Sequence, residues 1–99
     1  MTKTELIDVV AEKTGLTKKD CGEIVNTTLD TIVDHLSEEA QKGEDERDNV
    51  QIIGFGTFEA RDRSSRKGRN PQTGEEITIP ARTVPVFRAG KSFKDSVDK

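Results

Sequence analysis

The segment that most constrains this chain is 61–82, whose middle contains almost nothing that a protein core could bury. Apolar and polar residues alternate at its two ends, over 57–63 and 77–79, while Asn70-Pro71 and Gly74 lie near its middle. Alternating segments joined by turn residues predict a β-hairpin. Because a hairpin this polar cannot pack onto a core, we expect it to project from the body of the protein.

The charge of this segment points to an anionic partner. The whole chain has a net charge of −3, which taken alone argues against nucleic acid. However, residues 1–49 hold 6 basic and 13 acidic side chains, whereas residues 61–94 hold 9 basic and 3 acidic ones. A two-stranded ribbon fits a DNA groove, and guanidinium groups bind phosphate well. The alternative is a disordered, solubilising basic loop. The candidate DNA-binding cations of the hairpin are Arg61, Arg63, Arg66, Lys67, Arg69 and Arg82.

The first half of the chain predicts two helices. Thr2 and Glu5 fit a capping box in which each side chain accepts a hydrogen bond from the other residue's backbone N–H, and Gly15 is expected to end the first helix. Thr17 is the expected N-cap of a second helix that runs to Lys42-Gly43. The second helix has an apolar stripe at helical spacing. The stripe comprises Cys21, Ile24, Val25, Thr28, Leu29, Ile32, Val33, Leu36 and Ala40.

The second half predicts strands and a short terminal helix. In the segment 57–63, alternation places Phe58 and Ala60 on one face and Glu59 on the other. A proline in the strand at 84–87 implies an edge strand or a bulge. The expected strands cover 50–52, 57–63 with its return at 77–79, and 84–87, and the expected helix covers 91–99. The fold class is therefore α+β, in the order ααβββα.

The acidic stretch 44–49 lies between the helical and the β-rich halves and has no apolar residue. It is expected to be a solvated loop or a frayed extension of the helix.

Several functions are disfavoured by what the sequence lacks. The single Cys and the single His are expected to be structural, and no Cys/His cluster has zinc spacing. The sequence therefore predicts no enzyme, no cofactor, no metal site and no small-molecule substrate. We also expect no signal peptide, no membrane partner and a cytoplasmic location.

Three motifs in order resemble the HU and integration host factor family of bacterial histone-like proteins, which bend DNA. They are Gly-Phe-Gly-Thr-Phe at 54–58, Gly-Arg-Asn-Pro-Gln-Thr-Gly at 68–74, and Val-Pro-Val-Phe-Arg-Ala-Gly-Lys at 84–91, followed by Lys94-Asp95. The resemblance covers essentially the whole chain. It implies a non-enzymatic nucleoid protein that binds double-stranded DNA in the minor groove and bends or compacts it. It also implies an intertwined homodimer or heterodimer with a helical base, a β-sheet saddle and two ribbon arms.

The resemblance implies roles for individual residues. Pro71 matches the proline that wedges between base pairs. Arg63, Arg66, Arg69 and Asn70 match arm positions that contact groove and backbone, and Lys3, Lys91 and Lys94 match body positions that contact flanking phosphates.

A single domain, 1–99, is expected, with a helical dimerisation part at 1–49 and an arm at 62–82 inside the β-rich part 50–99. Removing the arm leaves a body near the size at which a core alone gives little stability. We therefore expect an obligate dimer with a shared apolar core. Its expected members are Leu29, Ile32, Phe55, Phe58 and Phe87.

The chain departs from the family pattern by an acidic insertion near 43–49, and Glu75 and Glu76 place two carboxylates on the arm. These could weaken DNA affinity, change its salt dependence, repel a wrong dimer partner or recruit a protein. The alternative function is a protein-interaction module that uses the acidic helical face and binds DNA weakly; an RNA binder ranks lower. General binding and preference for one DNA site both stay open.

Overall fold

The computed structural model describes all residues, 1–99, and divides into two compact units, Met1–Asp34 and His35–Lys99. The predicted α+β class is confirmed. The elements in chain order are α1 (Lys3–Thr14), α2 (Lys18–Glu39), the 3-10 helix η1 (Glu44–Glu46), β1 (Val50–Ile52), β2 (Gly56–Arg63), β3 (Arg66–Arg69), β4 (Glu76–Ile79), β5 (Arg82–Ala89) and α3 (Lys91–Val97). None of the helices is long and apolar enough to cross a membrane.

The helix boundaries of the first unit follow from local capping. The Thr2 hydroxyl oxygen accepts a hydrogen bond from the Glu5 N–H at 3.2 Å, as predicted. The return bond differs, because the Glu5 carboxylate accepts from the Thr2 hydroxyl at 3.3 Å rather than from its N–H. Gly15 ends α1 in the left-handed conformation, with φ 75°. The Thr17 hydroxyl accepts from the Asp20 N–H at 3.1 Å, which confirms the second N-cap.

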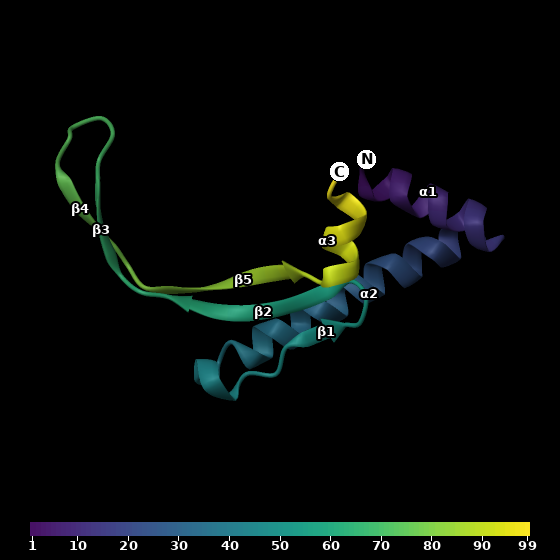
Figure 1. Ribbon diagram of the computed structural model, residues 1–99, viewed down its shortest axis with the longest axis horizontal. Coiled ribbons are helices and arrows are strands. Elements are labelled where there is room, and N and C mark those ends of the chain that lie inside the picture. The colour runs from purple at the N-terminus through teal and green to yellow at the C-terminus, as the bar shows by residue number, and fades with distance from the viewer. The chain divides into compact units, whose positions relative to one another are not determined.

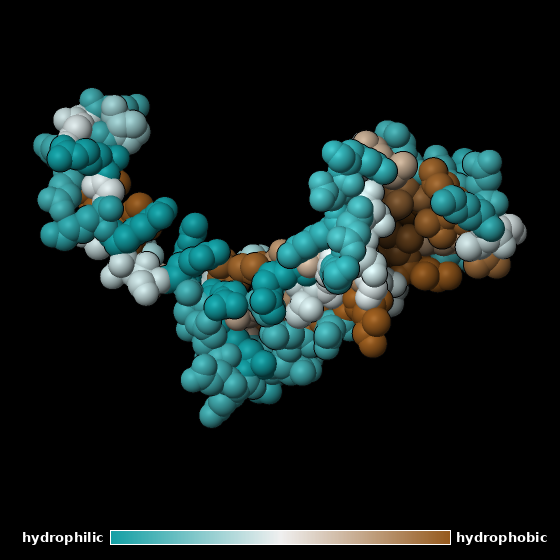
Figure 2. All heavy atoms as spheres, in the orientation of Figure 1, coloured by the Kyte–Doolittle hydropathy of each residue, from teal (hydrophilic) through white to brown (hydrophobic).

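Little apolar surface is covered within the first unit. Ala11 and Cys21 are its buried residues, with the Thr14 hydroxyl 3.7 Å from the Cys21 sulfur. The predicted stripe of α2 exists, but Ile24, Leu29 and Val33 on it are exposed. Hydrophobic surface is visible over α1 and this part of α2 in Figure 2. The stripe is therefore largely without a partner inside the chain.

The second unit is built on a three-stranded antiparallel sheet with the order β1-β2-β5. The central strand β2 pairs with β5 over its whole length, from Gly56 opposite Ala89 to Arg63 opposite Arg82. Pro85 therefore lies in an edge strand, as its missing N–H predicts.

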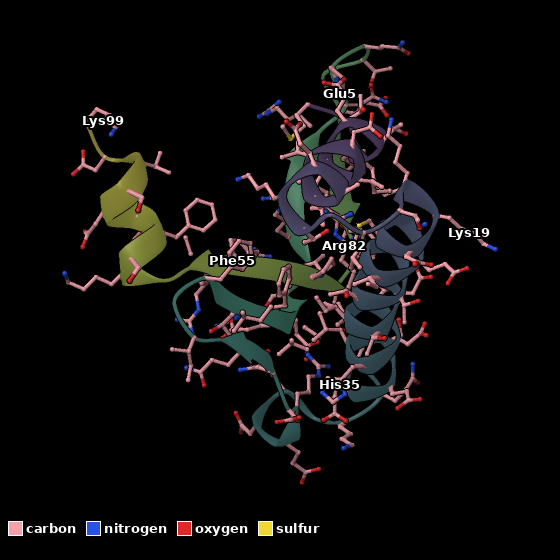
Figure 3. All side chains as sticks on the ribbon, turned by 90° about the vertical axis from the view of Figure 1, so that its right-hand side faces the viewer. Glu5, Lys19, His35, Phe55, Arg82 and Lys99 are labelled. Atoms are coloured by element: carbon pink, nitrogen blue, oxygen red, sulfur yellow. The ribbon has the colours of Figure 1, made fainter.

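Three of the predicted dimer-core residues gather on this sheet. The ring centroid of Phe87 lies 5.3 Å from that of Phe55 and 4.7 Å from that of Phe58, and Phe55 lies 5.2 Å from Phe93 of α3. Phe55 is labelled in Figure 3. The cluster is not covered within the chain, since Phe55 and Phe87 remain 43% and 39% exposed.

The predicted hairpin is present as a separate two-stranded ribbon of β3 and β4. Its register runs from Arg66 opposite Ile79 to Arg69 opposite Glu76. Strand pairing is interrupted at 64–65 and at 80–81, where Pro80 offers no N–H, so the predicted strands divide into five. Figure 1 shows the ribbon at the far end of β2 and β5 from α3.

One local prediction is wrong, and two others are incomplete. The helix α2 ends at Glu39 rather than at Lys42-Gly43, and 40–42 form a turn. Glu59 lies on the face of β2 opposite Phe58 and Ala60, as alternation predicts, but its carboxylate is buried there beside Arg61 and Arg88. The acidic stretch is solvent-exposed, as predicted, except at Arg47, whose side chain is buried; three of its residues form the 3-10 helix η1.

Candidate nucleic-acid interface

Three arginines gather where the ribbon joins the sheet. Arg63, Arg66 and Arg82 line a hollow of about 210 Å³ together with Ser64, Ile79 and Pro80. None of the three takes part in an ion pair with a carboxylate within the chain. The break in strand pairing thus brings three predicted site residues together around a space that suits an anion.

Other predicted cations are already paired with carboxylates. Arg61 lies 3.3 Å from a Glu59 oxygen and 3.6 Å from a Glu44 oxygen. On the ribbon, Lys67 lies 3.3 Å from Glu76. These contacts partly compensate the positive charge that a phosphate would meet, Arg61 most of all, because it has two acidic neighbours.

The predicted cations outside the ribbon lie on α1 and α3. Lys3 begins α1 in the first unit and is exposed, with no ion pair. On α3, Lys91 pairs with Asp95 at 3.0 Å one helical turn away, whereas Lys94 has no acidic partner. An exposed pair at this spacing is weak, so all three cations remain available to a phosphate.

The ribbon tip is held by its own hydrogen bonds. The Asn70 N–H donates to the Glu75 carbonyl at 2.8 Å, and the Gly74 N–H donates to the Asn70 carbonyl at 2.7 Å. The side-chain oxygen of Asn70 accepts from the Gln72 N–H at 2.8 Å. These bonds close the turn around Pro71, which is exposed at the tip. Asn70 therefore shapes the tip and keeps only its NH₂ group free for a ligand.

Arg69 also supports the tip from within the ribbon. Its Nη1 donates to the Gly74 carbonyl at 3.1 Å, and it lies in no ion pair. Figure 2 shows that the ribbon carrying these residues is mainly hydrophilic. The ribbon thus presents cationic side chains along its length and a proline at its end.

Sequence reasoning missed three residues whose side chains support β2. They are Glu59, Arg88 and Arg47. The Arg88 guanidinium donates to the carboxylate of Glu59 on β2, and the Arg47 guanidinium donates to the Ala60 carbonyl of the same strand. Alternation placed Glu59 on the face opposite Phe58 and Ala60 without indicating that it is buried, and Arg88 stood in a recognised motif without a role. No sequence signal marked Arg47, because it lies in an acidic stretch whose contacts are distant in sequence.

The described side chains do not form a metal centre, since no group of three His, Cys, Asp or Glu residues could hold an ion. The site can bind a ligand through charge and shape, because it combines a basic ribbon, a proline at the tip and a hollow lined by arginines at the base.

Comparison with known proteins assigns this arrangement. The model of a family described as bacterial DNA-binding protein matches residues 1–98. The chain belongs to the HU/IHF family. DNA-binding protein HU-1 of Halalkalibacterium halodurans is 56% identical over 97 residues, which cover 98% of this chain and 99% of that one. DNA-binding protein HU 1 of Bacillus subtilis is 55% identical, with 98% and 97% covered.

A solved structure agrees with the sequence relatives. The HU protein of an Anabaena HU–DNA cocrystal superimposes with a TM-score of 0.85 at 44% identity, covering 98% of this chain and 97% of that one. As an HU-type protein, the chain is a non-enzymatic, architectural DNA-binding protein. The resemblance seen in the three sequence motifs is confirmed.

Proposed function

We propose that the ribbon and the arginines at its base bind the minor groove of double-stranded DNA and bend it. The observation that carries this proposal is that Arg63 and Arg82 lie directly opposite each other in the sheet and have no acidic partner. Like charges opposite each other destabilise a strand pair. A phosphate backbone between them would remove that repulsion and release bound counterions.

Pro71 at the exposed tip is proposed as the bending wedge. Minor-groove architectural proteins, HU and IHF among them, insert apolar side chains between base steps and kink the duplex. The pyrrolidine ring of Pro71 is rigid, and the turn that carries it is closed by the Asn70 hydrogen bonds. Little conformational entropy is therefore lost when the ring inserts between base pairs. The bend brings further phosphates within reach of cations on the body, for which Lys3, Lys91 and Lys94 are the candidates.

A dimer with two ribbons is part of the proposal. The stripe residue Leu29 is 45% exposed, and the Phe55–Phe87 cluster is also incompletely covered. A second copy, or a paralogue of it, would bury these side chains in a shared core together with Ile32 and Phe58. We place the dimer on DNA in the bacterial nucleoid.

Dimerisation is tested by sedimentation equilibrium of Leu29→Asp. We expect dissociation or unfolding, because a carboxylate would enter the shared core. Ile77→Asp is the matched control, since Ile77 is similarly exposed at 43% but lies on the ribbon. Dimers of unchanged stability in Leu29→Asp would contradict the proposed core.

DNA binding through the arginine hollow is tested by fluorescence anisotropy on a duplex across a salt series. Binding by ion pairs predicts log K falling linearly with log salt. The double variant Arg63→Gln/Arg82→Gln should lower the magnitude of this slope by about 2, since each phosphate contact contributes roughly 1. The charge-matched control Lys13→Gln/Lys99→Gln should leave it nearly unchanged.

Equal slopes in the two variants would remove the arginine hollow from the interface. No binding of the wild-type protein even at low salt would overturn DNA binding and favour a protein-interaction module on the acidic helical face.

A further inference from the structure

The edge of β2 loses its strand partner before the ribbon begins. The short strand β1 pairs with β2 only from Val50 opposite Phe58 to Ile52 opposite Gly56. From Glu59 to Arg63, β2 pairs with β5 alone. In an antiparallel ladder, the backbone groups of alternate residues point to the same neighbour. Ala60 and Asp62 therefore turn their backbone groups toward the edge that β1 has left.

Side chains of the acidic insertion fill that edge. Arg47 Nη1 donates to the Ala60 carbonyl at 3.1 Å. Glu44 Oε2 accepts from the Asp62 N–H at 3.2 Å. A carbonyl and an N–H that a neighbouring strand would have bonded are thus satisfied by the turn that contains η1. The insertion acts along this edge as a strand would.

Arg47 is anchored at several points. Its Nε donates to the Lys42 carbonyl at 3.0 Å and its Nη2 to the Ala40 carbonyl at 3.2 Å, just after α2. Nη2 also lies 2.9 Å from Asp62 Oδ1, and the Arg47 side chain is only 5% exposed. The same Asp62 oxygen accepts from the Thr83 hydroxyl at 2.9 Å. One buried guanidinium therefore links the end of α2 to β2 and, through Asp62, to β5.

The turn is also fixed on its other side. Glu39 Oε1 accepts from the Asp48 N–H at 2.7 Å, and the other Glu39 oxygen lies 2.8 Å from Lys42 Nζ. His35, labelled in Figure 3, lies 3.1 Å from the Asp48 carboxylate through its Nε2. The insertion is thus bonded both to the last turns of α2 and to β2.

We infer that residues 43–48 form a brace that fixes the direction in which β2 leaves the sheet toward the ribbon, with Arg47 as its positioning residue. Asp62 is the second-last residue of β2, and strand pairing is interrupted two residues later. Holding Asp62 therefore holds the base of the ribbon. The effect of the brace on DNA rests on the function proposed above, because there the direction of the ribbon sets the bend of the duplex.

The brace is tested first on the free protein, by amide hydrogen exchange. Arg47→Met keeps a long side chain and removes every donor. The Asp62 N–H is bonded to Glu44, and Arg47 anchors the turn that carries Glu44 to Ala60 and Asp62. With that anchor lost, we expect the Asp62 amide to exchange about tenfold faster or more, the effect of losing roughly one hydrogen bond. The Asn70 amide at the ribbon tip should not change. Glu46→Gln is the control, because Glu46 is an exposed acid of the same turn whose side chain makes no hydrogen bond or ion pair.

Unchanged exchange at Asp62 in Arg47→Met would overturn the brace. If Arg47→Met fails to fold, Glu44→Gln removes only the carboxylate charge that accepts the Asp62 N–H. A smaller acceleration at the same amide is then expected, and its absence would overturn the brace equally.

The positioning role is tested on bound DNA, by fluorescence transfer between the duplex ends. Arg47→Met should give a smaller or broader distribution of bends, while its affinity changes less than the bend does. A turn that only repels DNA predicts the opposite ranking, with Glu46→Gln binding more tightly and the bend unchanged in both variants. Faster exchange with an unaltered bend would overturn the positioning role. A wild-type protein that does not bend DNA would overturn the proposed function and leave the exchange result standing.

Discussion

The Glu59 carboxylate on β2 is bonded to the Arg88 guanidinium on β5, with Glu59 Oε1 2.8 Å from Arg88 Nη2, although Glu59 is only 5% exposed. The two residues are diagonal neighbours, since Glu59 lies opposite Val86 and Arg88 follows two residues later. Arg61 approaches the other carboxylate oxygen at 3.3 Å. A buried acid between two arginines thus ties β2 to β5.

Removing the charge of Glu59 should weaken the sheet. Glu59→Gln keeps the shape but turns charge-assisted bonds into neutral ones, so we expect a loss of about 1–2 kcal/mol in the free energy of unfolding. Urea denaturation at one protein concentration measures it. The control is Glu76→Gln, whose carboxylate pairs with Lys67 on the exposed ribbon and should change stability by less than about 0.5 kcal/mol. Equal effects in the two variants would contradict the structural role of Glu59.

Acid should destabilise the protein through two carboxylates that are bonded to the brace. Hydrogen bonds from Arg47 and from Thr83 lower the pKa of Asp62 below its ordinary value of 3.8. A hydrogen bond from Lys42 and one from the Asp48 backbone lower the pKa of Glu39 below its ordinary 4.5. A carboxyl group with a lowered pKa in the folded state contributes stability above its unfolded pKa and loses it as the pH falls through the folded one.

The resulting test is thermal unfolding between about pH 6 and pH 2. The wild-type protein should lose stability below about pH 4.5, where the two carboxylates begin to take up protons on unfolding. Asp62→Asn should be less stable than wild type at neutral pH and lose less on acidification, because one of the responsible groups is gone. Parallel curves for the two proteins would exclude Asp62 as a source of the acid response.

The glycine at the start of β2 should tolerate no side chain. A Cβ at Gly56 would lie 2.5 Å from the Arg88 carbonyl oxygen and 2.6 Å from the Phe87 ring. Gly56→Ala should therefore cost about 1–3 kcal/mol or prevent folding, as overpacked cores do. Gly68→Ala is the matched control, since its Cβ would meet only the movable end of Ile79 at 3.1 Å. Thermal unfolding distinguishes them, and similar melting temperatures would contradict the close packing at Gly56.

Replacing the tip proline should separate bending from binding. Pro71→Ala removes the rigid apolar wedge but none of the cations, so the bend should fall while most of the salt-dependent affinity remains. Fluorescence transfer across a labelled duplex reports the bend, and anisotropy reports the affinity. An unchanged bend would show that Pro71 is not the wedge.

Features governed by local chemistry were predictable from the sequence. The caps at Thr2 and Thr17, the end of α1 at Gly15 and the ribbon turn near Asn70 depend on residues a few positions apart. The ribbon itself followed from the lack of anything to bury between 61 and 82. Three motifs spread along the chain were enough to place it in its family.

Other features needed the tertiary structure. The burial of Glu59 depends on Arg88, which is distant in sequence, whereas alternation assigned only the strand face of Glu59. The same holds for Arg47, whose acceptors lie on both sides of a stretch that reads as polar loop.

By itself, the sequence thus determined the helices, the ribbon, the family and the excess of cations on the ribbon, because each rests on local periodicity, turn chemistry, motifs or composition. Only the tertiary structure decided which cations have no acidic partner and which are paired with carboxylates of the same chain. Arg63 and Arg82 keep no acidic partner, whereas Arg61 and Arg47 have carboxylates from other segments beside them. The physical reason is that an ion pair forms by proximity in space, which strand register and a docked turn create and which no spacing along the chain encodes.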